Sequence, residues 1–212
     1  MPSVNTKEVY VIDIASNTVI GTIPMPSNSY GIAFPPPASV PSSGTACNGT
    51  YNGTFKGNIN VSAGQNCSFV GGGVTGNVVV TGGNFAFANG LIAGSVGIAG
   101  ASTFTLGPAA TINGSLGVGL VARGTTTDQV CGVTVLHDFG VAGDASPLQI
   151  GSASAASCAD NTIRGNATID VNPPAIAFYG NSVTGTLSCL AKKSITGGGN
   201  TAKRKLGQCT AF

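Results

Sequence analysis

The stretch Gly73-Val74-Thr75-Gly76-Asn77-Val78-Val79-Val80 contains one copy of a repeat that decides the fold. The repeat reads apolar, any residue, glycine, small polar, apolar, any residue, apolar. Its central glycine recurs at six positions: Gly57, Gly76, Gly94, Gly114, Gly165 and Gly185. A seventh copy, residues 135–141, carries His137 in place of the glycine. We expect His137 to be a surface residue at a corner of the fold.

The spacing of the copies predicts a solenoid. Successive marked positions are 19, 18, 20, 23, 28 and 20 residues apart, and a period near 20 is typical of stacked coils. Within each copy, apolar residues alternate with others, which is the period of a β-strand. The uneven steps favour a right-handed parallel β-helix, with coils of 18–28 residues, over left-handed hexapeptide helices. The two longest steps predict loops that bulge from one region, around Gly119–Gln129 and Gly143–Ala159.

The same register predicts which side chains fill the core. We expect Phe85 and Phe87 to point inward. They match Phe104 and Leu106 in the next coil and Cys67 and Phe69 in the coil before, so that like positions stack from coil to coil. The repeated glycine should occupy a corner with positive φ or a close backbone approach, where a Cβ atom costs energy. The Asn, Ser or Thr that follows it can hydrogen-bond to the corner backbone.

Six cysteines test this period independently. They are Cys47, Cys67, Cys131, Cys158, Cys189 and Cys209, and pairing in chain order gives separations of 20, 27 and 20 residues. These values match the local coil lengths, so each pair falls at nearly the same azimuth in neighbouring coils, within disulfide range. We predict the disulfides 47–67, 131–158 and 189–209. The alternative is six buried free thiols that act as small core residues.

Composition narrows the classes of function. Disulfides indicate an oxidising compartment, so we expect an extracellular or cell-surface protein. There is no C-x-x-C motif for zinc, and we predict no metal and no cofactor. The net charge of +2, with only 8% charged residues, argues against nucleic acid as a partner. The sequence contains no run of 18 apolar residues, so we predict no transmembrane helix, and no signal peptide is visible.

The N-terminal region does not follow the repeat. Residues 8–14, 18–24 and 30–34 read as short strands. The runs Val9-Tyr10-Val11-Ile12-Asp13, Asn17–Pro24 and Tyr30–Phe34 together resemble one blade of a YVTN-type β-propeller. One blade cannot close a propeller, so this antiparallel segment is expected to be the end of a longer ancestral or precursor chain. We divide the chain into residues 1–34, a Pro/Ser-rich linker at 35–45, and the β-helix at 46–212.

The β-helical region resembles Gly- and Asn-rich repeat proteins from secreted bacterial chains. The residues that carry this resemblance are Ser62–Cys67, the Val-x-Gly-Asn-Val copies, and Ser194–Lys203 with Gln208-Cys209. The resemblance implies a bacterial extracellular β-helix and brings no activity with it. Val-x-Gly-Asn-Val also resembles bactofilins, which polymerise end to end, although bactofilins are cytosolic and the cysteines favour an oxidising compartment.

Candidate chemistry is sparse, because the chain has only seven acidic residues. His137 and Asp138 are the only His–Asp neighbours, but adjacent strand residues point to opposite faces. Asp144 and Asp160 lie in the predicted loops and could approach them. Five of the nine basic residues gather near the C-terminus, at Lys192, Lys193, Lys203, Arg204 and Lys205. This cluster fits an end cap that blocks strand pairing; contact with an anionic polymer is the alternative.

The sequence therefore favours a non-catalytic, disulfide-stapled structural or adhesive protein. One alternative is a β-helix that binds or cleaves polysaccharide with the bulged face near His137, Asp138, Asp144 and Asp160. Another is a subunit that self-assembles through its coil ends or N-terminal strands. The expected partners are a second copy or a cell-surface polysaccharide. An ice-binding face would need Thr-x-Thr rows in successive coils, and Thr103-Phe104-Thr105 is a single instance.

Overall fold

The chain divides into two compact units, Met1–Val40 and Pro41–Phe212. The division falls within the linker predicted from the sequence. The computed structural model describes residues 8–13, 18–24, 44–119, 126–143, 147–154, 158–171, 176–190 and 195–212. In the first unit, β1 (Glu8–Asp13) and β2 (Thr18–Pro24) pair as an antiparallel hairpin. The third predicted strand, residues 30–34, lies outside the described residues.

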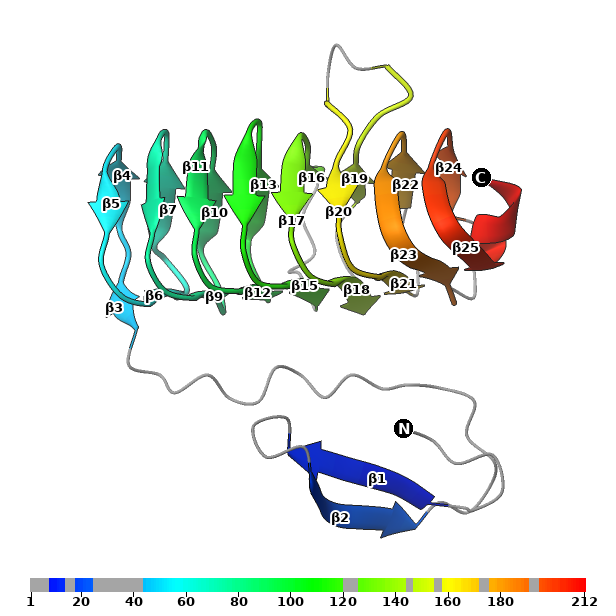
Figure 1. Cartoon of the computed structure of the whole chain (residues 1–212). Coiled ribbons are helices and arrows are strands. Elements are labelled where there is room, and N and C mark those ends of the chain that lie inside the picture. The colour runs from blue at the N-terminus through cyan, green and yellow to red at the C-terminus, as the bar shows by residue number, and fades with distance from the viewer. Residues whose placement is uncertain are drawn as a thin grey trace. The chain divides into compact units, whose positions relative to one another are not determined.

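The second unit is a parallel β-helix, as the repeat predicts (Figure 1). Its coils present three strand faces, which we name first, second and third. The first face is one sheet of eight parallel strands: β4 (Gly49–Tyr51), β7 (Asn66–Phe69), β10 (Asn84–Phe87), β13 (Thr103–Leu106), β16 (Asp128–Val130), β19 (Leu148–Ile150), β22 (Ile176–Tyr179) and β24 (Thr196–Gly198).

The second and third faces join into one sheet near the C-terminus. The second face comprises β5 (Thr54–Phe55), β8 (Gly72–Val74), β11 (Gly90–Ile92), β14 (Ala110–Ile112), β17 (Val133–Val135) and β20 (Thr162–Ile163). The third comprises β3 (Thr45–Ala46), β6 (Ile59–Val61), β9 (Val78–Val80), β12 (Val96–Ala99), β15 (Leu116–Gly119), β18 (Phe139–Gly143) and β21 (Ala167–Val171). The long strands β23 (Ser182–Cys189) and β25 (Thr201–Gly207) run through both faces, and the short 3-10 helix η1 (Gln208–Ala211) follows.

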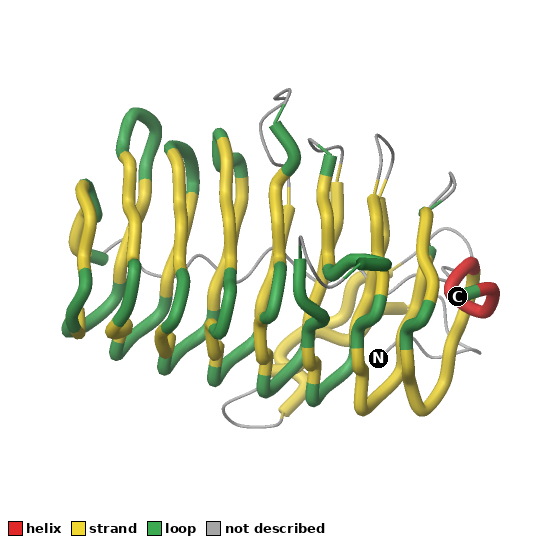
Figure 2. The backbone as a smooth tube through the Cα atoms, turned by 90° about the horizontal axis from the view of Figure 1, so that it is seen from above, coloured by secondary structure: helices red, strands yellow, loops and turns green. Residues whose placement is uncertain are grey.

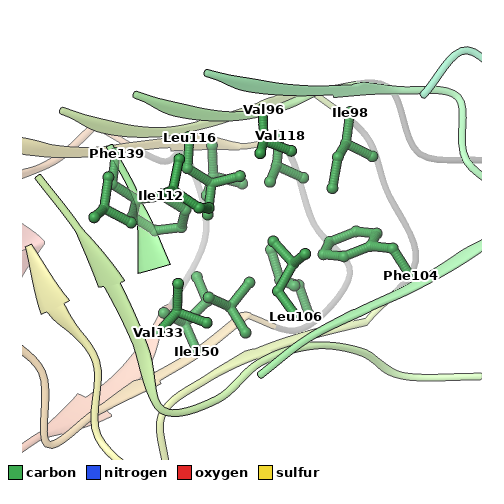
Figure 3. Close-up of a cluster of buried hydrophobic side chains, with 14 of the residues drawn as sticks. Val96, Ile98, Phe104, Leu106, Ile112, Leu116, Val118, Val133, Phe139 and Ile150 are labelled. Carbon is green, nitrogen blue, oxygen red and sulfur yellow. The ribbon is translucent and has the colours of Figure 1, made fainter. Parts of the chain in front are cut away.

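The core consists of side-chain columns that run along the helix axis. Phe85 faces Cys67 in one neighbouring strand and Phe104 in the other, and Phe87 lies in the same way between Phe69 and Leu106. All six are buried, so the predicted inward pairs are confirmed. Figure 3 shows how apolar side chains from the three faces meet inside the coil, among them Phe104, Ile112 and Leu116.

The corner between the second and third faces explains the repeated glycine. A Cβ atom on Gly76, Gly94, Gly114, Gly165 or Gly185 would lie only 2.2–2.5 Å from a polar side-chain oxygen of the preceding coil. Gly57, in the first coil, instead has a φ of +97°. Close stacking of the corners therefore requires glycine at five of the six predicted positions, and backbone conformation favours it at the sixth.

The long steps of the repeat do not form one bulged region, which corrects the prediction. β19 lies inside the predicted loop Gly143–Ala159, and β16 begins within the predicted loop Gly119–Gln129. The added residues fall at two different corners. The chain between β15 and β16 leads from the third face to the first, whereas the chain between β19 and β20 leads from the first face to the second. Figure 2 shows the strands and turns of the stacked coils. A count of residues between glycines gives the size of an insertion but not its corner.

The three predicted disulfides are present. Cys47–Cys67, Cys131–Cys158 and Cys189–Cys209 have Cα–Cα distances of 5.3, 4.8 and 5.2 Å. No helix within the described residues is long and apolar enough to cross a membrane.

Candidate functional site

Asp138 belongs to a ladder of polar side chains at the corner between the second and third faces. In this ladder, the side-chain oxygen of one coil accepts a hydrogen bond from the backbone N–H of the next. Asn58 accepts from Asn77 at 2.8 Å, and Asn77 accepts from Ser95 at 2.8 Å. Asp138 Oδ1 accepts from Asn166 N at 2.7 Å and from Asn166 Nδ2 at 3.2 Å. The predicted role of the residue after the glycine is therefore confirmed, and the Asp138 carboxylate serves as a corner acceptor.

His137 is exposed at this corner, as expected for a residue that replaces the glycine. The backbone N–H of Gly94, Gly114, Gly165 and Gly185 each donates to the residue one coil earlier. Among the described residues, His137 N–H makes no such bond to Gly114, although His137 O accepts from Gly165 N at 3.0 Å. His137 thus places an exposed side chain at a corner position that carries glycine in the other copies.

Asp160 occupies a different corner. It precedes β20 on the second face, whereas His137 aligns with Gly165, which follows β20. Asp160 and Gly165 are five residues apart along the chain, and five residues of extended chain span about 16 Å. The structure therefore does not bring Asp160 together with His137 and Asp138. Asp144 lies outside the described residues.

Asp128 is a buried carboxyl group whose role the sequence did not reveal. It is 2% exposed and faces Leu148 in an otherwise apolar column of the first face. Phe104 N donates to Oδ1 at 2.8 Å, while Oδ2 has no partner. Burial raises the Asp128 pKa from 3.8 to about 6, and the hydrogen bond from Phe104 opposes that rise. Alignment of residues 128–130 with residues 104–106 would have placed Asp128 inward.

A second feature missed from the sequence is a ladder of buried asparagines at the corner between the first and second faces. Asn161 Nδ2 donates to Asn181 Oδ1 at 2.8 Å, and Asn181 Nδ2 donates to Asn200 Oδ1 at 3.1 Å. The same amides also donate to the main-chain carbonyls of Val130 and Ile150. The signal was an Asn-Ser/Thr dipeptide repeated at 161, 181 and 200. This internal polar chain is satisfied by its own members and by backbone, which indicates a structural role.

The outer surface of the second face carries a column of hydroxyl groups. Consecutive strands align Thr111, Thr134, Thr162, Ser182 and Thr201. On the first face, the backbone N–H of Asn66 donates to Asn48 Oδ1, and the side-chain amide of Asn84 donates to Asn66 Oδ1. These columns present neutral donors and acceptors. From β14 onward each strand adds one hydroxyl to the column of the second face, instead of the paired Thr-x-Thr rows of an ice-binding surface.

The basic cluster lies on the last strand. Lys203, Arg204 and Lys205 belong to β25, and Lys205 Nζ donates to the carbonyl of Phe212. Lys192 and Lys193 lie outside the described residues. The part of the chain that the structure describes contains no group of three His, Cys, Asp or Glu side chains able to hold a metal ion.

Comparisons with known proteins do not add a family. No protein-family profile, curated protein or solved structure matches the chain.

Proposed function

We propose that this chain is a non-catalytic extracellular structural protein, a disulfide-braced β-helix whose neutral outer columns serve adhesion. The observation that carries the proposal is the arrangement of the three disulfides. Cys47–Cys67 joins the first coil to the second, and Cys189–Cys209 holds the C-terminal cap. Cys131–Cys158 joins the segment between β19 and β20, which contains the longest insertion, to the preceding coil just after β16. Each disulfide braces a place where coil stacking is incomplete or irregular, and such bonds persist in oxidising compartments.

The carboxylates support a role without catalysis. Cleavage of a polysaccharide by paired carboxyl groups needs two of them about 5–10 Å apart beside the bond. Here Asp138 is bound to the Asn166 backbone, Asp128 is enclosed in the core, and Asp160 lies at another corner. These three described carboxyl groups therefore form no acid–base pair.

Thiol state tests the compartment. The protein should be isolated from its native cells without reductant, denatured, and treated with a maleimide of measurable mass. We expect label on none of the six cysteines, with the protein in the medium or accessible to protease on intact cells. Six labelled cysteines in protein from the cell interior would overturn the proposal.

A glycan panel tests the role. We expect no cleavage of neutral or acidic polysaccharides, and we expect Asp138→Asn and Asp144→Asn to leave any glycan binding unchanged. Loss of a measured glycan activity in either variant would instead support the polysaccharide-active alternative near His137. Asp138→Asn is a suitable variant because an amide oxygen can still accept the hydrogen bonds from Asn166.

A further inference from the structure

The two ends of the β-helix differ in how they treat their strand edges. Within the described residues, β3, β4 and β5 of the first coil each pair with one neighbouring strand only. The carbonyls of Tyr51, Gly53 and Phe55 accept hydrogen bonds from the second coil. Because alternate residues of a strand direct their backbone groups to opposite sides, the N–H and C=O groups of Thr50 and Thr54 point away from it. The first coil is thus an open edge.

In the last coil, β24 and β25 also pair with one strand each, but this end carries a cap. η1 follows β25 and is tied back by Cys189–Cys209. The Phe212 ring lies where a side chain on Gly197 would be, 2.6 Å from the Cβ position of that residue, and so packs against the end of the core. Lys203, Arg204 and Lys205 add positive charge to the edge strand, a device that discourages strand pairing.

We propose that the first coil is an interface for a second copy of this chain, which pairs head to head to form a closed dimer. The two β4 strands would run antiparallel across a two-fold axis, as an isologous contact requires. Such pairing would bring together the half-buried rings of Tyr51 and Phe55, which already pack edge to face with centroids 5.9 Å apart. The protected last coil ends the assembly at two copies.

Charge favours a second copy over a charged partner. Residues 44–61 contain one charged side chain, Lys56. This edge offers no negative charge to a basic partner and a single positive charge to an acidic one, and the repulsion between two copies is limited to that lysine. At the other end, Lys203 and Arg204 on β25 oppose contact between two C-terminal caps, while Lys205 is bound to Phe212, so the described β-helix has one self-compatible end.

The inference deepens the proposed structural role, but its test measures mass and can fail while that role stands. Light scattering after size exclusion, on the full chain over a wide concentration range, should show a species of twice 20.7 kDa that dissociates on dilution. A monomer at every concentration, as when another segment of the chain covers the edge, would overturn the proposal. Filaments or species larger than a dimer would overturn it as well.

Matched lysine variants locate the interface. Thr50→Lys with Thr54→Lys places charge on two exposed edge positions, and we expect the dissociation constant to rise at least about tenfold. The control is Thr105→Lys with Thr111→Lys. Thr105 lies in the same outward column as Thr50, with Ser68 and Ala86 between them. Thr111 lies in the same outward column as Thr54, with Gly73 and Leu91 between them.

The control should dimerise like the native chain, and circular dichroism should show that both variants keep their strand content. A dimer that survives the edge substitutions would contradict the proposed interface. So would a control that is weakened to the same extent.

Discussion

The regular coils of residues 44–119 and the irregular coils of residues 126–212 are held together by different means. In the first region the coil steps are 18–20 residues, aromatic columns fill the first face, and the asparagines Asn48, Asn66 and Asn84 form a ladder on the surface. In the second region the steps reach 28 residues, a different asparagine ladder, Asn161, Asn181 and Asn200, is buried, and two of the three disulfides occur. In the region that contains the long steps, buried amides and two disulfides add to the matched apolar columns, which continue there.

The buried ladder should give the largest effect. Asn181→Leu removes the amide that links Asn161 to Asn200 and leaves buried polar groups without partners. We expect the free energy of unfolding to fall by about 4 kcal/mol, measured by denaturant titration without reductant. Asn66→Ala in the exposed ladder of the regular region is the matched control and should cost less than about 1 kcal/mol. Equal losses would remove the distinction between the two regions.

The disulfide of the longest insertion ranks second. Cys131→Ser with Cys158→Ser should cost about 3 kcal/mol, because the bond closes a 27-residue separation. Limited proteolysis should then cut near residues 151–161. Cys47→Ser with Cys67→Ser removes a bond of similar span, 20 residues, at the open end. There we expect fraying of the first coil and no new cut in the insertion; the reverse pattern would disprove this assignment.

The buried carboxyl group of Asp128 predicts a pH dependence confined to the irregular region. Its pKa is raised to about 6 in the fold, so the native state holds the proton more tightly than the unfolded chain. Stability should be greatest below pH 4, fall by roughly 2–3 kcal/mol as the pH rises to about 6, and then level off.

The groups that face Asp128 do not complicate this titration. The described strands packed beside it, β13 and β19, carry no charged side chain. Asp128→Asn keeps an acceptor for Phe104 N–H and should flatten the dependence between pH 4 and 6. An unchanged slope in this variant would mean that another group is responsible.

Corner glycines give the smallest effect. Gly94→Ala places a Cβ 2.3 Å from Asn77 Oδ1 and should cost about 2 kcal/mol in unfolding free energy. Gly117→Ala, on the outer surface of the third face in the next coil, has open space around it and should change stability by less than about 0.5 kcal/mol. If both substitutions are equally harmless, close corner stacking is not the reason for the repeat.

Much of the regular region could be predicted from sequence, for a physical reason. Each coil there repeats the same contacts, so the register of Phe85 with Phe104 and the partner of Cys47 follow from the period. The irregular region resists that logic because an insertion can enter at any corner. The placement of β19, the burial of Asp128 and the separation of Asp160 from His137 all depend on which corner took the extra residues.

Native-state amide hydrogen exchange, read by mass spectrometry with and without reductant, tests the contrast most directly. In a solenoid each coil contacts only its neighbours, so stability can be lost locally. We predict that reduction leaves residues 66–119 protected and sharply increases exchange in the described residues from 128 to 171 and in β25. A uniform loss of protection along the β-helix, or a loss confined to residues 66–119, would contradict this account.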